Sequence, residues 1–388
     1  MRLPFDLDDP ILARAAWSRI AEPADRQALA LVAAAGPAAA LRWLAGTGRV
    51  GADRPDGIGG LEQARERWRA RLDGLDPRRE LDALARLGGW LAIPEAAGWP
   101  EALADLGAET PFCLWVRTGA LGPAELPERL TPAVSVVGAR AATAYGESVA
   151  AGLVGDLAAR GVGIVSGGAF GIDAAAHRTA LAVGGVTVAV MAGGVDRLYP
   201  QGNERLLAAV VADGAVVSEL PPGAAPRRER FLSRNRLIAA LSQVTVVVEA
   251  GWRSGAHRTA GVAAELLRPV AAVPGPVTAA SSAGCHRLIR QGIATLVTGA
   301  DEVRELLAPL GSAPLAEPSA QPGLLDGLAP ADRQVLDSLP LRQGVTVTAL
   351  VMSSGLSAPQ AMAALSRLER SGRAEQSDGL WRRSRVAR

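Results

Sequence analysis

Residues 162–183 read VGIVSGGAFGIDAAAHRTALAV, in which an apolar run meets a glycine-rich turn and then a helical pattern. A strand that is apolar on both faces, followed by a helix, is typical of a parallel sheet covered by helices. Further apolar runs of strand length occur at 133–137, 186–191, 215–217, 244–248, 270–273 and 293–297. Helical patterns separate most of the runs, at 145–160, 172–183, 203–212 and 256–267. The sequence therefore predicts an α/β fold, with a doubly wound, mostly parallel Rossmann-like sheet over residues 126–310.

The segment before this sheet, residues 1–125, is predicted to form a helical domain. Its apolar side chains recur about every 3.6 residues, at 11–20, 25–35, 37–44, 61–72 and 77–87. Short helices with glycine-bearing turns are typical of sterile-alpha-motif (SAM) or helix-hairpin-helix domains, which grip phosphates with turn amides. A plain helical bundle fits the same pattern, so the role of this domain stays open.

The segment after the sheet divides into a linker and a small domain. Residues 311–325 are rich in Pro, Ser, Ala and Gly and predict the linker. Three helical patterns and a hairpin around Asp378-Gly379 then predict a winged-helix domain over 326–388. Its last stretch, 367–388, holds seven arginines against three acidic residues, a local charge of 7 − 3 = +4. DNA binding and protein docking are both consistent with that charge.

Composition excludes several classes of function. The chain of 388 residues carries 41 basic and 39 acidic residues, and every basic one is arginine. Without lysine there is no P-loop lysine, no Schiff base and no pyridoxal phosphate chemistry. The two cysteines, Cys113 and Cys285, cannot build a disulfide framework. Acidic residues within 1–10 do not fit the basic start of a signal peptide. The longest apolar stretch, 181–195, is short and contains four glycines. We expect a cytoplasmic protein with no membrane span.

The loops at the carboxyl ends of the predicted strands share glycine, hydroxyl and arginine residues. The first loop offers Gly138 for close backbone approach and Arg140 as a fork for phosphate, while Thr143 caps the next helix or contacts a phosphate. Asp173 and Glu249 are candidates for helix caps or for partners of Arg140 and Arg234. The aromatic residues Phe170, Phe231 and Trp252 are candidates for base stacking beside the arginines. Together the loops indicate an extended anionic ligand.

The sequence lacks the common motifs of enzymes that have this type of sheet. The loop after 133–137 is not G-x-G-x-x-G, and no G-x-S-x-G occurs. His177, His257 and His286 lie far apart in the sequence, without carboxylates or cysteines at ligand spacing, so no metal site is expected. His177 is interpreted as a packed or capped histidine rather than a base. We predict no catalytic residues and no cofactor.

Taken together, the loops resemble the DprA (Smf) family of DNA-processing proteins. The resemblance rests on motifs in a fixed order: Ser135–Arg140, Tyr145-Gly146, Ser166-Gly167-x-Ala169-x-Gly171-Ile172-Asp173 through His177, Tyr199-Pro200, Ser218-Glu219, Phe231-x-x-Arg234-Asn235-Arg236, Val248-Glu249-Ala250, Ser254-Gly255 and Pro274-Gly275. It covers residues 130–305, and more weakly the flanking regions. One departure is Phe170, which stands where the family often has a basic residue.

The resemblance implies a protein that binds single-stranded DNA, forms a homodimer and helps to load the RecA recombinase during natural transformation. The implied DNA- or phosphate-binding residues are Gly138, Arg140, Thr143, Ser166, Gly167, Gly168, Gly171, Asp173, Arg234, Asn235, Arg236, Arg253, Ser254 and Gly255. Two rival hypotheses remain. A nucleotide-cleaving, phosphoribohydrolase-like enzyme shares this type of sheet, but its Pro-Gly-Gly-x-Gly-Thr loop is absent here. A transcription regulator would instead act on duplex DNA through the predicted winged helix.

Overall fold

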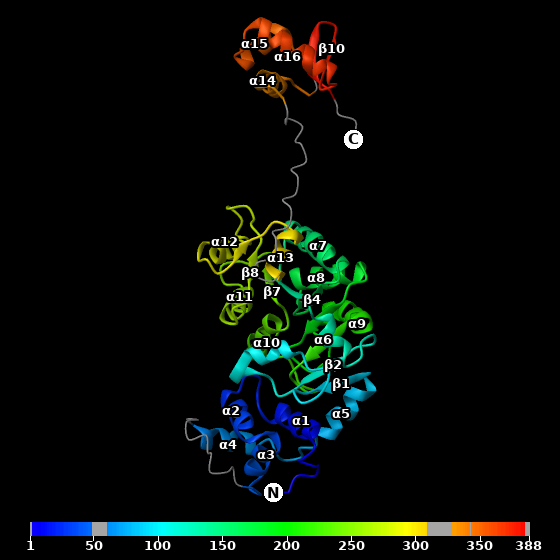
Figure 1. The fold of residues 1–388 in the computed structure, drawn as a ribbon, viewed down its shortest axis with the longest axis vertical. Helices are drawn as coiled ribbons and strands as arrows, with labels where there is room; N and C mark the ends of the chain where they lie inside the picture. Colours follow the sequence, from blue (N-terminus) through cyan, green and yellow to red (C-terminus); the bar gives the residue numbers. More distant parts are fainter. Residues whose placement is uncertain (1, 49–59, 309–327, 342, 385–388) are drawn as a thin grey trace. The chain divides into compact units, whose positions relative to one another are not determined.

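The computed structural model describes residues 2–48, 60–308, 328–341 and 343–384. The chain separates into two compact units, residues 1–315 and 316–388, and each is described by itself. The predicted linker at 311–325 lies outside the described residues. Figure 1 traces the order of the elements along the chain.

Among the described residues of the first unit, nine strands form one sheet in the order β1-β2-β6-β5-β4-β3-β7-β8-β9. The strands are β1 (Gly89–Ala92), β2 (Leu114–Arg117), β3 (Ala133–Val137), β4 (Gly163–Ser166), β5 (Thr187–Val190), β6 (Ala215–Ser218), β7 (Val244–Val247), β8 (Val270–Ala272) and β9 (Thr295–Leu296). Strands β3 to β9 pair in parallel, whereas β1 and β2 add antiparallel pairs at one edge. The predicted mostly parallel, Rossmann-like sheet is confirmed.

Helices cover both faces of the sheet. On one face lie α7 (Ala144–Ala159), α8 (Ile172–Ala182) and α13 (Ala300–Leu307); on the other lie α10 (Arg228–Ala240), α11 (Ala256–Glu265) and α12 (Ala283–Arg290). The sequence of β3 explains the two cores, because successive strand side chains point to opposite faces. Val134 and Val136 pack against α7 and α8, while Ala133 and Val137 belong to the core under α10 and α11.

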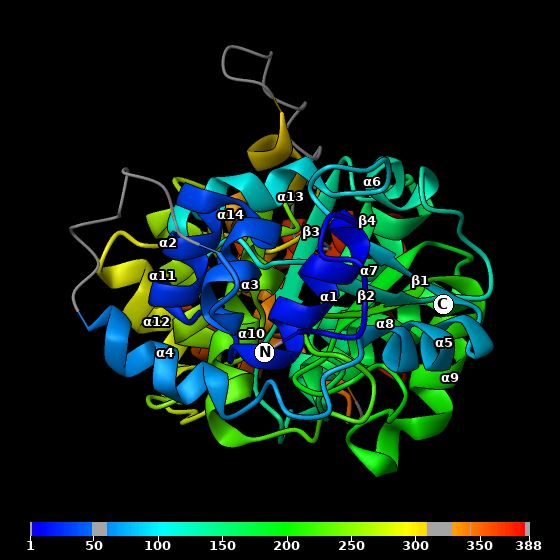
Figure 2. The ribbon, with the colours of Figure 1, turned by 90° about the horizontal axis from the view of Figure 1, so that it is seen from below.

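The N-terminal helices were predicted correctly. They are α1 (Pro10–Ile20), α2 (Arg26–Ala35), α3 (Pro37–Ala45), α4 (Leu61–Arg69) and α5 (Pro77–Arg86). In both views α1, α2 and α3 gather near the N-terminus, at one end of the unit (Figures 1 and 2). Trp17 and Leu41 from these helices share one buried core with Trp115 of β2 and Val216 of β6. The predicted domain boundary at residue 125 therefore falls inside a continuous core.

The prediction of helices up to residue 125 is wrong at β1 and β2, which extend the sheet. Between them the chain forms a 3₁₀ segment, η1 (Glu101–Glu109), and after them comes the short helix α6 (Glu125–Arg129). Trp115 pairs with Ser218 of β6, so this edge of the sheet is built from the N-terminal part of the chain. The loop into α9 (Glu204–Asp213) contains the 3₁₀ turn η2 (Gln201–Asn203).

The second unit holds three helices and a hairpin, as predicted. The helices are α14 (Pro330–Ser338), α15 (Val347–Ser354) and α16 (Ala358–Arg370), and the antiparallel strands are β10 (Ala374–Ser377) and β11 (Leu380–Arg383). Asp378 and Gly379 both have positive φ, 51° and 76°, as a two-residue hairpin turn requires. Leu336, Leu350, Leu365 and Trp381 are buried in a core of its own.

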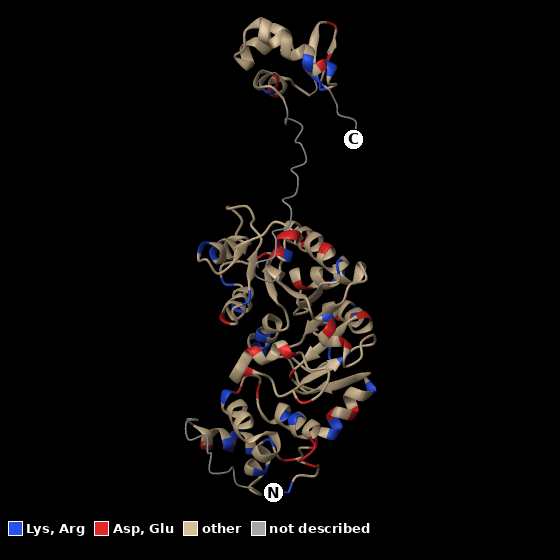
Figure 3. Ribbon diagram, viewed as in Figure 1, with Lys and Arg blue, Asp and Glu red and all other residues tan. Residues whose placement is uncertain are grey.

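Acidic and basic side chains are interspersed on most helices of the first unit (Figure 3). Helices α10 and α13 carry both signs of charge, but α12 carries Arg287 and Arg290 without an acidic residue. Within the described residues, no single helix is long and apolar enough to cross a membrane. Helices α2 and α3 reach that length and apolar composition only when they are taken together, and they are bent by 112° relative to each other.

Candidate nucleic-acid interface

A pocket of about 420 Å³ opens at the carboxyl end of the sheet between β3 and β7. The strand order reverses direction at this point, because β4 follows β3 on one side while β7 joins it on the other. In open α/β sheets such a switch point is where ligands bind. Of the predicted site residues, the pocket brings together Gly138, Arg140, Asp173, Arg234, Asn235, Arg253, Ser254 and Gly255.

Arg140 and Arg253 present exposed guanidinium groups at this pocket. Neither side chain makes a hydrogen bond or ion pair with another described residue. The Arg140 guanidinium carbon lies 5.4 Å from the centroid of the Phe231 ring, a cation–π contact that holds the arginine over an aromatic face. These two arginines retain all their donors for an anion.

Arg234 lies beneath the pocket and is buried. Its Nη1 donates to the carbonyl oxygens of Gly167, at 2.8 Å, and of Val190. Burial lowers the pKa of Arg234 to about 10, and burial also raises the pKa of the neighbouring Asp173 despite the attraction of the arginine. The Asp173 carboxylate accepts from the backbone N–H groups of Gly167 (3.2 Å) and Ala169 (3.4 Å). This pair fixes the floor of the pocket.

Arg236 does not lie at the pocket, although it was predicted to face phosphate. Its Nη1 and Nη2 donate to the two carboxylate oxygens of Glu219, each at 2.7 Å, in a buried bidentate ion pair. Its Nε also donates to the carbonyl of Glu109, at 3.1 Å. Because the guanidinium is enclosed by these partners, Arg236 connects α10 to β6 and to η1 rather than meeting a ligand.

The predicted hydroxyl contacts are used inside the fold. Thr143 caps α7, because its Oγ1 accepts from the Gly146 N–H (3.2 Å) and donates to the buried Glu249 (2.7 Å). Ser166 donates to the carbonyl of Val136 at 2.6 Å. Thr143 is therefore the helix cap, while Glu249 accepts from the Thr143 hydroxyl and backbone N–H and pairs with neither Arg140 nor Arg234. The Ser254 hydroxyl accepts from the Ala256 N–H at 3.3 Å, at the start of α11.

The glycines allow the loops to approach one another closely. Gly171 has φ +73°, and a Cβ there would lie 2.2 Å from the carbonyl oxygen of Ala139. A Cβ on Gly167 would lie 2.2 Å from the Arg234 guanidinium, so the residue leaves room for the buried arginine. Gly168 also has positive φ, at +68°. Asn203 was not predicted as a site residue, yet its Nδ2 donates to the Gly168 and Ala169 carbonyls, both at 3.0 Å.

The three stacking candidates lie around the pocket rather than in its lining. Phe170 and Trp252 are 47% and 55% exposed, and Phe231 is half-buried. Two residues that were not predicted as site residues join them. The ring of Tyr199 lies 5.8 Å from that of Phe231, and the Arg287 guanidinium carbon lies 5.1 Å from the centroid of Trp252. The Tyr199-Pro200 motif was a signal for the first of these, but no local pattern pointed to Arg287.

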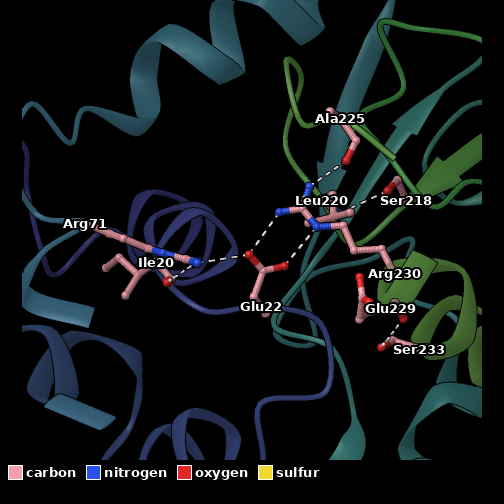
Figure 4. Close-up of polar contacts among 9 residues, drawn as sticks. All are labelled: Ile20, Glu22, Arg71, Ser218, Leu220, Ala225, Glu229, Arg230 and Ser233. Atoms are coloured by element: carbon pink, nitrogen blue, oxygen red, sulfur yellow. Dashed lines mark hydrogen bonds and ion pairs between the residues drawn. The ribbon is translucent and has the colours of Figure 1, made fainter. Parts of the chain in front are cut away.

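A second cleft of about 420 Å³, between α1, α5 and α10, has a different character. Arg230 donates to both oxygens of Glu22, at 2.9 and 3.0 Å, and Arg71 donates to the same carboxylate at 3.0 Å (Figure 4). Five arginines and four acidic residues line this cleft, so its charges nearly balance. It is a junction between the N-terminal helices and α10 rather than an anion site.

His177 lies outside the pocket and is buried, as interpreted from the sequence. Its Nδ1 lies 2.7 Å from the Thr187 hydroxyl, which itself donates to the Ile164 carbonyl. Nδ1 must therefore carry the proton and donate to the hydroxyl. Burial lowers the pKa of His177 to about 3, so the ring is neutral at pH 7. Over the described ranges, no three His, Cys, Asp or Glu side chains gather as a metal site requires.

Comparisons with known proteins agree on one family. The model of the family described as DNA recombination-mediator protein A matches residues 90–308. A putative DNA processing protein DprA from Mycobacterium tuberculosis is 46% identical over 387 residues, covering 97% of this chain and 95% of that protein. Protein Smf from Synechocystis is 32% identical, covering 73% of this chain and 69% of that protein.

A solved structure supports the same assignment. The X-ray structure of DNA processing protein A from Streptococcus pneumoniae superposes with a TM-score of 0.59 at 28% identity, covering 75% of this chain and 95% of that one. The family match spans the whole parallel sheet and the pocket at its switch point. The chain belongs to the DNA recombination-mediator protein A family, whose members include the DNA-processing proteins named DprA and Smf.

Proposed function

We propose that this chain binds single-stranded DNA at the switch-point pocket and acts as a DNA-processing protein without catalysis. The observation that carries the proposal is the exposed Arg140 held over Phe231 at the mouth of the pocket, with Arg253 opposite and equally unpaired. Arginine forks neutralise phosphates, and aromatic faces accept any base without reading sequence. Bases are available for stacking only where they are not already paired, which favours a single strand.

The remaining parts of the proposal follow from family membership. Single-stranded DNA entering the cytoplasm during natural transformation would be protected and passed to the RecA recombinase by a homodimer of this chain. The N-terminal helices α1 to α5 would act as a module of the SAM or helix-hairpin-helix type, and residues 326–388 as a winged helix. The three helices and hairpin of the second unit support the latter assignment.

Fluorescence anisotropy with an oligothymidine and with its duplex, across a salt series, tests the proposal. We expect tighter binding to the single strand. If about four phosphates are contacted, log K falls against log salt with a slope of roughly −3. Weak sequence preference should accompany this salt dependence. A flat salt response, or a preference for the duplex, would contradict the proposal.

The rival enzymatic function has a separate readout. A phosphoribohydrolase would release free base from nucleoside monophosphates, which chromatography detects directly. We expect no release above the rate without protein. Base release together with absent oligonucleotide binding would replace the proposal with a nucleotide-cleaving function at the same pocket.

A further inference from the structure

A long segment of the first unit carries arginine but no carboxylate. Between Glu265 and Asp301 the sequence contains no acidic residue, whereas Arg268, Arg287 and Arg290 all lie within it. Arg268 is occupied, since it donates to Asp105 and to several carbonyls. Arg287 and Arg290 are three residues apart on α12, so both project from the same side of the helix.

Trp252 connects this helix to the pocket. Its ring is 55% exposed and lies 5.1 Å from the guanidinium carbon of Arg287. The next residue along the chain, Arg253, lines the pocket itself. In the described parts of the chain, the side chains of Arg253, Arg287 and Arg290 make no hydrogen bond or ion pair. Cationic and aromatic groups therefore continue without interruption from the pocket to α12.

A merely solvated basic face would look different. On α13 and at the end of α7, by contrast, arginines have carboxylate partners close in sequence: Arg304 lies 3.2 Å from Asp301, and Arg160 lies 3.9 Å from Asp156. Intrahelical pairs of this kind stabilise solvated helices. Arg287 and Arg290 have none, and one of them lies over an exposed tryptophan. Unpaired arginine beside an exposed aromatic ring is the chemistry that binds the backbone and the bases of a single strand.

We propose that single-stranded DNA leaving the pocket continues over Trp252 and along α12. This α12 track comprises Trp252, Arg253, Arg287 and Arg290. It rests on the proposed function and extends it, because it makes the bound segment longer than the pocket alone can hold. One base stacks on Trp252, and Arg287 and Arg290 neutralise the phosphates that follow.

The test compares a short oligothymidine of about 5 nucleotides with a longer one of about 20, spanning the usual site sizes. The double variant Arg287→Ala/Arg290→Ala should bind the longer strand about 10-fold more weakly and the short one within about 2-fold of wild type. Its salt slope for the longer strand should be shallower by about 1.4, since each lost phosphate contact removes about 0.7. Trp252→Ala should weaken the longer strand similarly, and Trp252→Phe should restore most of the affinity.

A charge-matched control is Arg69→Ala/Arg86→Ala, which removes two exposed arginines at the ends of α4 and α5. It should leave both affinities within about 2-fold. The proposed track would be contradicted if the control and the α12 variant lost equal affinity. It would also be contradicted if the α12 variant lost equal affinity for both strand lengths. If the wild type binds neither strand, the proposed function itself fails; if it binds both and α12 variants match it, only the track fails.

Discussion

Arg140 follows β3 and Arg234 lies on α10, and both were predicted to face phosphate, yet their side chains have different tasks. Arg140 is exposed and its donors are unused, while Arg234 is buried with Nη1 committed to two backbone carbonyls. A buried guanidinium next to the Asp173 carboxylate is part of the fold. Removing it leaves Asp173 buried without its nearby cation and leaves the carbonyls of Gly167 and Val190 without a donor.

The two arginines should therefore separate binding from stability. Arg140→Ala should weaken oligothymidine binding by about 1–2 kcal/mol, as expected for one charge-assisted contact, and leave urea unfolding unchanged. Arg234→Ala should lower the free energy of unfolding by about 3 kcal/mol because of the buried partners left behind. Anisotropy and urea denaturation of both variants measure the two effects. Unchanged affinity in Arg140→Ala would place the DNA elsewhere, and unchanged stability in Arg234→Ala would contradict the buried contacts.

His177 should make the stability of the first unit dependent on pH. Its pKa is about 3 in the folded chain and about 6.5 when unfolded, so below pH 6.5 the unfolded state binds more protons. Stability is then lost as pH falls from about 6.5 toward about 3. From pH 7 to pH 5 the loss due to this ring should be about 2 kcal/mol.

Urea denaturation at pH 7 and pH 5 measures that loss, with His177→Gln as the control because glutamine does not titrate. Groups other than His177 contribute equally to both proteins and cancel in the difference. We expect the variant to lose about 2 kcal/mol less than wild type over this range. Equal losses in the two proteins would mean that His177 is not held neutral by its surroundings.

At the level of side chains, the sequence indicated which loops line the pocket but not the role of every residue. The loops around Arg140 and Arg253 could be predicted, because strand ends of a parallel sheet converge at one edge. Thr143, Ser166 and Arg236 turned inward, since their partners are Glu249, the Val136 carbonyl and Glu219. Each of those partners lies at least 17 residues away in the chain, and no local pattern records such a pairing.

At the level of elements, most of the fold could be predicted because its strands are buried on both faces. Valine-rich runs such as that of β7 need no knowledge of their neighbours to be recognised. Strands β1 and β2 were missed because they belong to a segment otherwise rich in helix signals. Helix α10 was not predicted because its four arginines obscure the apolar face formed by Leu237 and Ile238.

The junction between the N-terminal helices and α10 should be energetically coupled. Glu22 and Arg230 are 208 residues apart, and the side chain of Arg230 is 13% exposed. A double-mutant cycle of Glu22→Gln and Arg230→Gln, followed by urea denaturation, should give a coupling of about 1 kcal/mol, at the upper end for partly exposed pairs. The hydrogen bond from Arg230 lowers the pKa of Glu22. The coupling is therefore present above the ordinary glutamate pKa and is lost as pH falls through the lowered value.

The exposed pair Arg160 and Asp156, at 3.9 Å, supplies a matched cycle within one helix end. It should give well under about 0.5 kcal/mol, because water screens both groups. If the two cycles give the same coupling, the Glu22–Arg230 pair stabilises the fold no more than a surface ion pair does. The N-terminal helices would then be held to the sheet by their shared apolar core and by other contacts, such as the hydrogen bond from Trp115 to Ser18.

At the level of the whole molecule, each unit has its own core. The residues that bury Trp381 and Leu365 all belong to the second unit, while the cores on the two faces of the sheet belong to the first. All residues that line the switch-point pocket, and all of the α12 track, belong to the first unit. A unit with its own core can fold without the other.

We therefore expect a chain shortened to residues 1–315 to keep both its fold and its DNA affinity. Its affinity for an oligothymidine of about 20 nucleotides should stay within about 2-fold of the full chain, and the salt slope should be unchanged, because no phosphate contact is removed. Anisotropy measures affinity, and circular dichroism during heating verifies that the shortened chain unfolds cooperatively. A fall of about 10-fold with a shallower salt slope would assign phosphate contacts to residues 316–388. That result would favour DNA over protein as the partner of the second unit, whose charge alone is consistent with either.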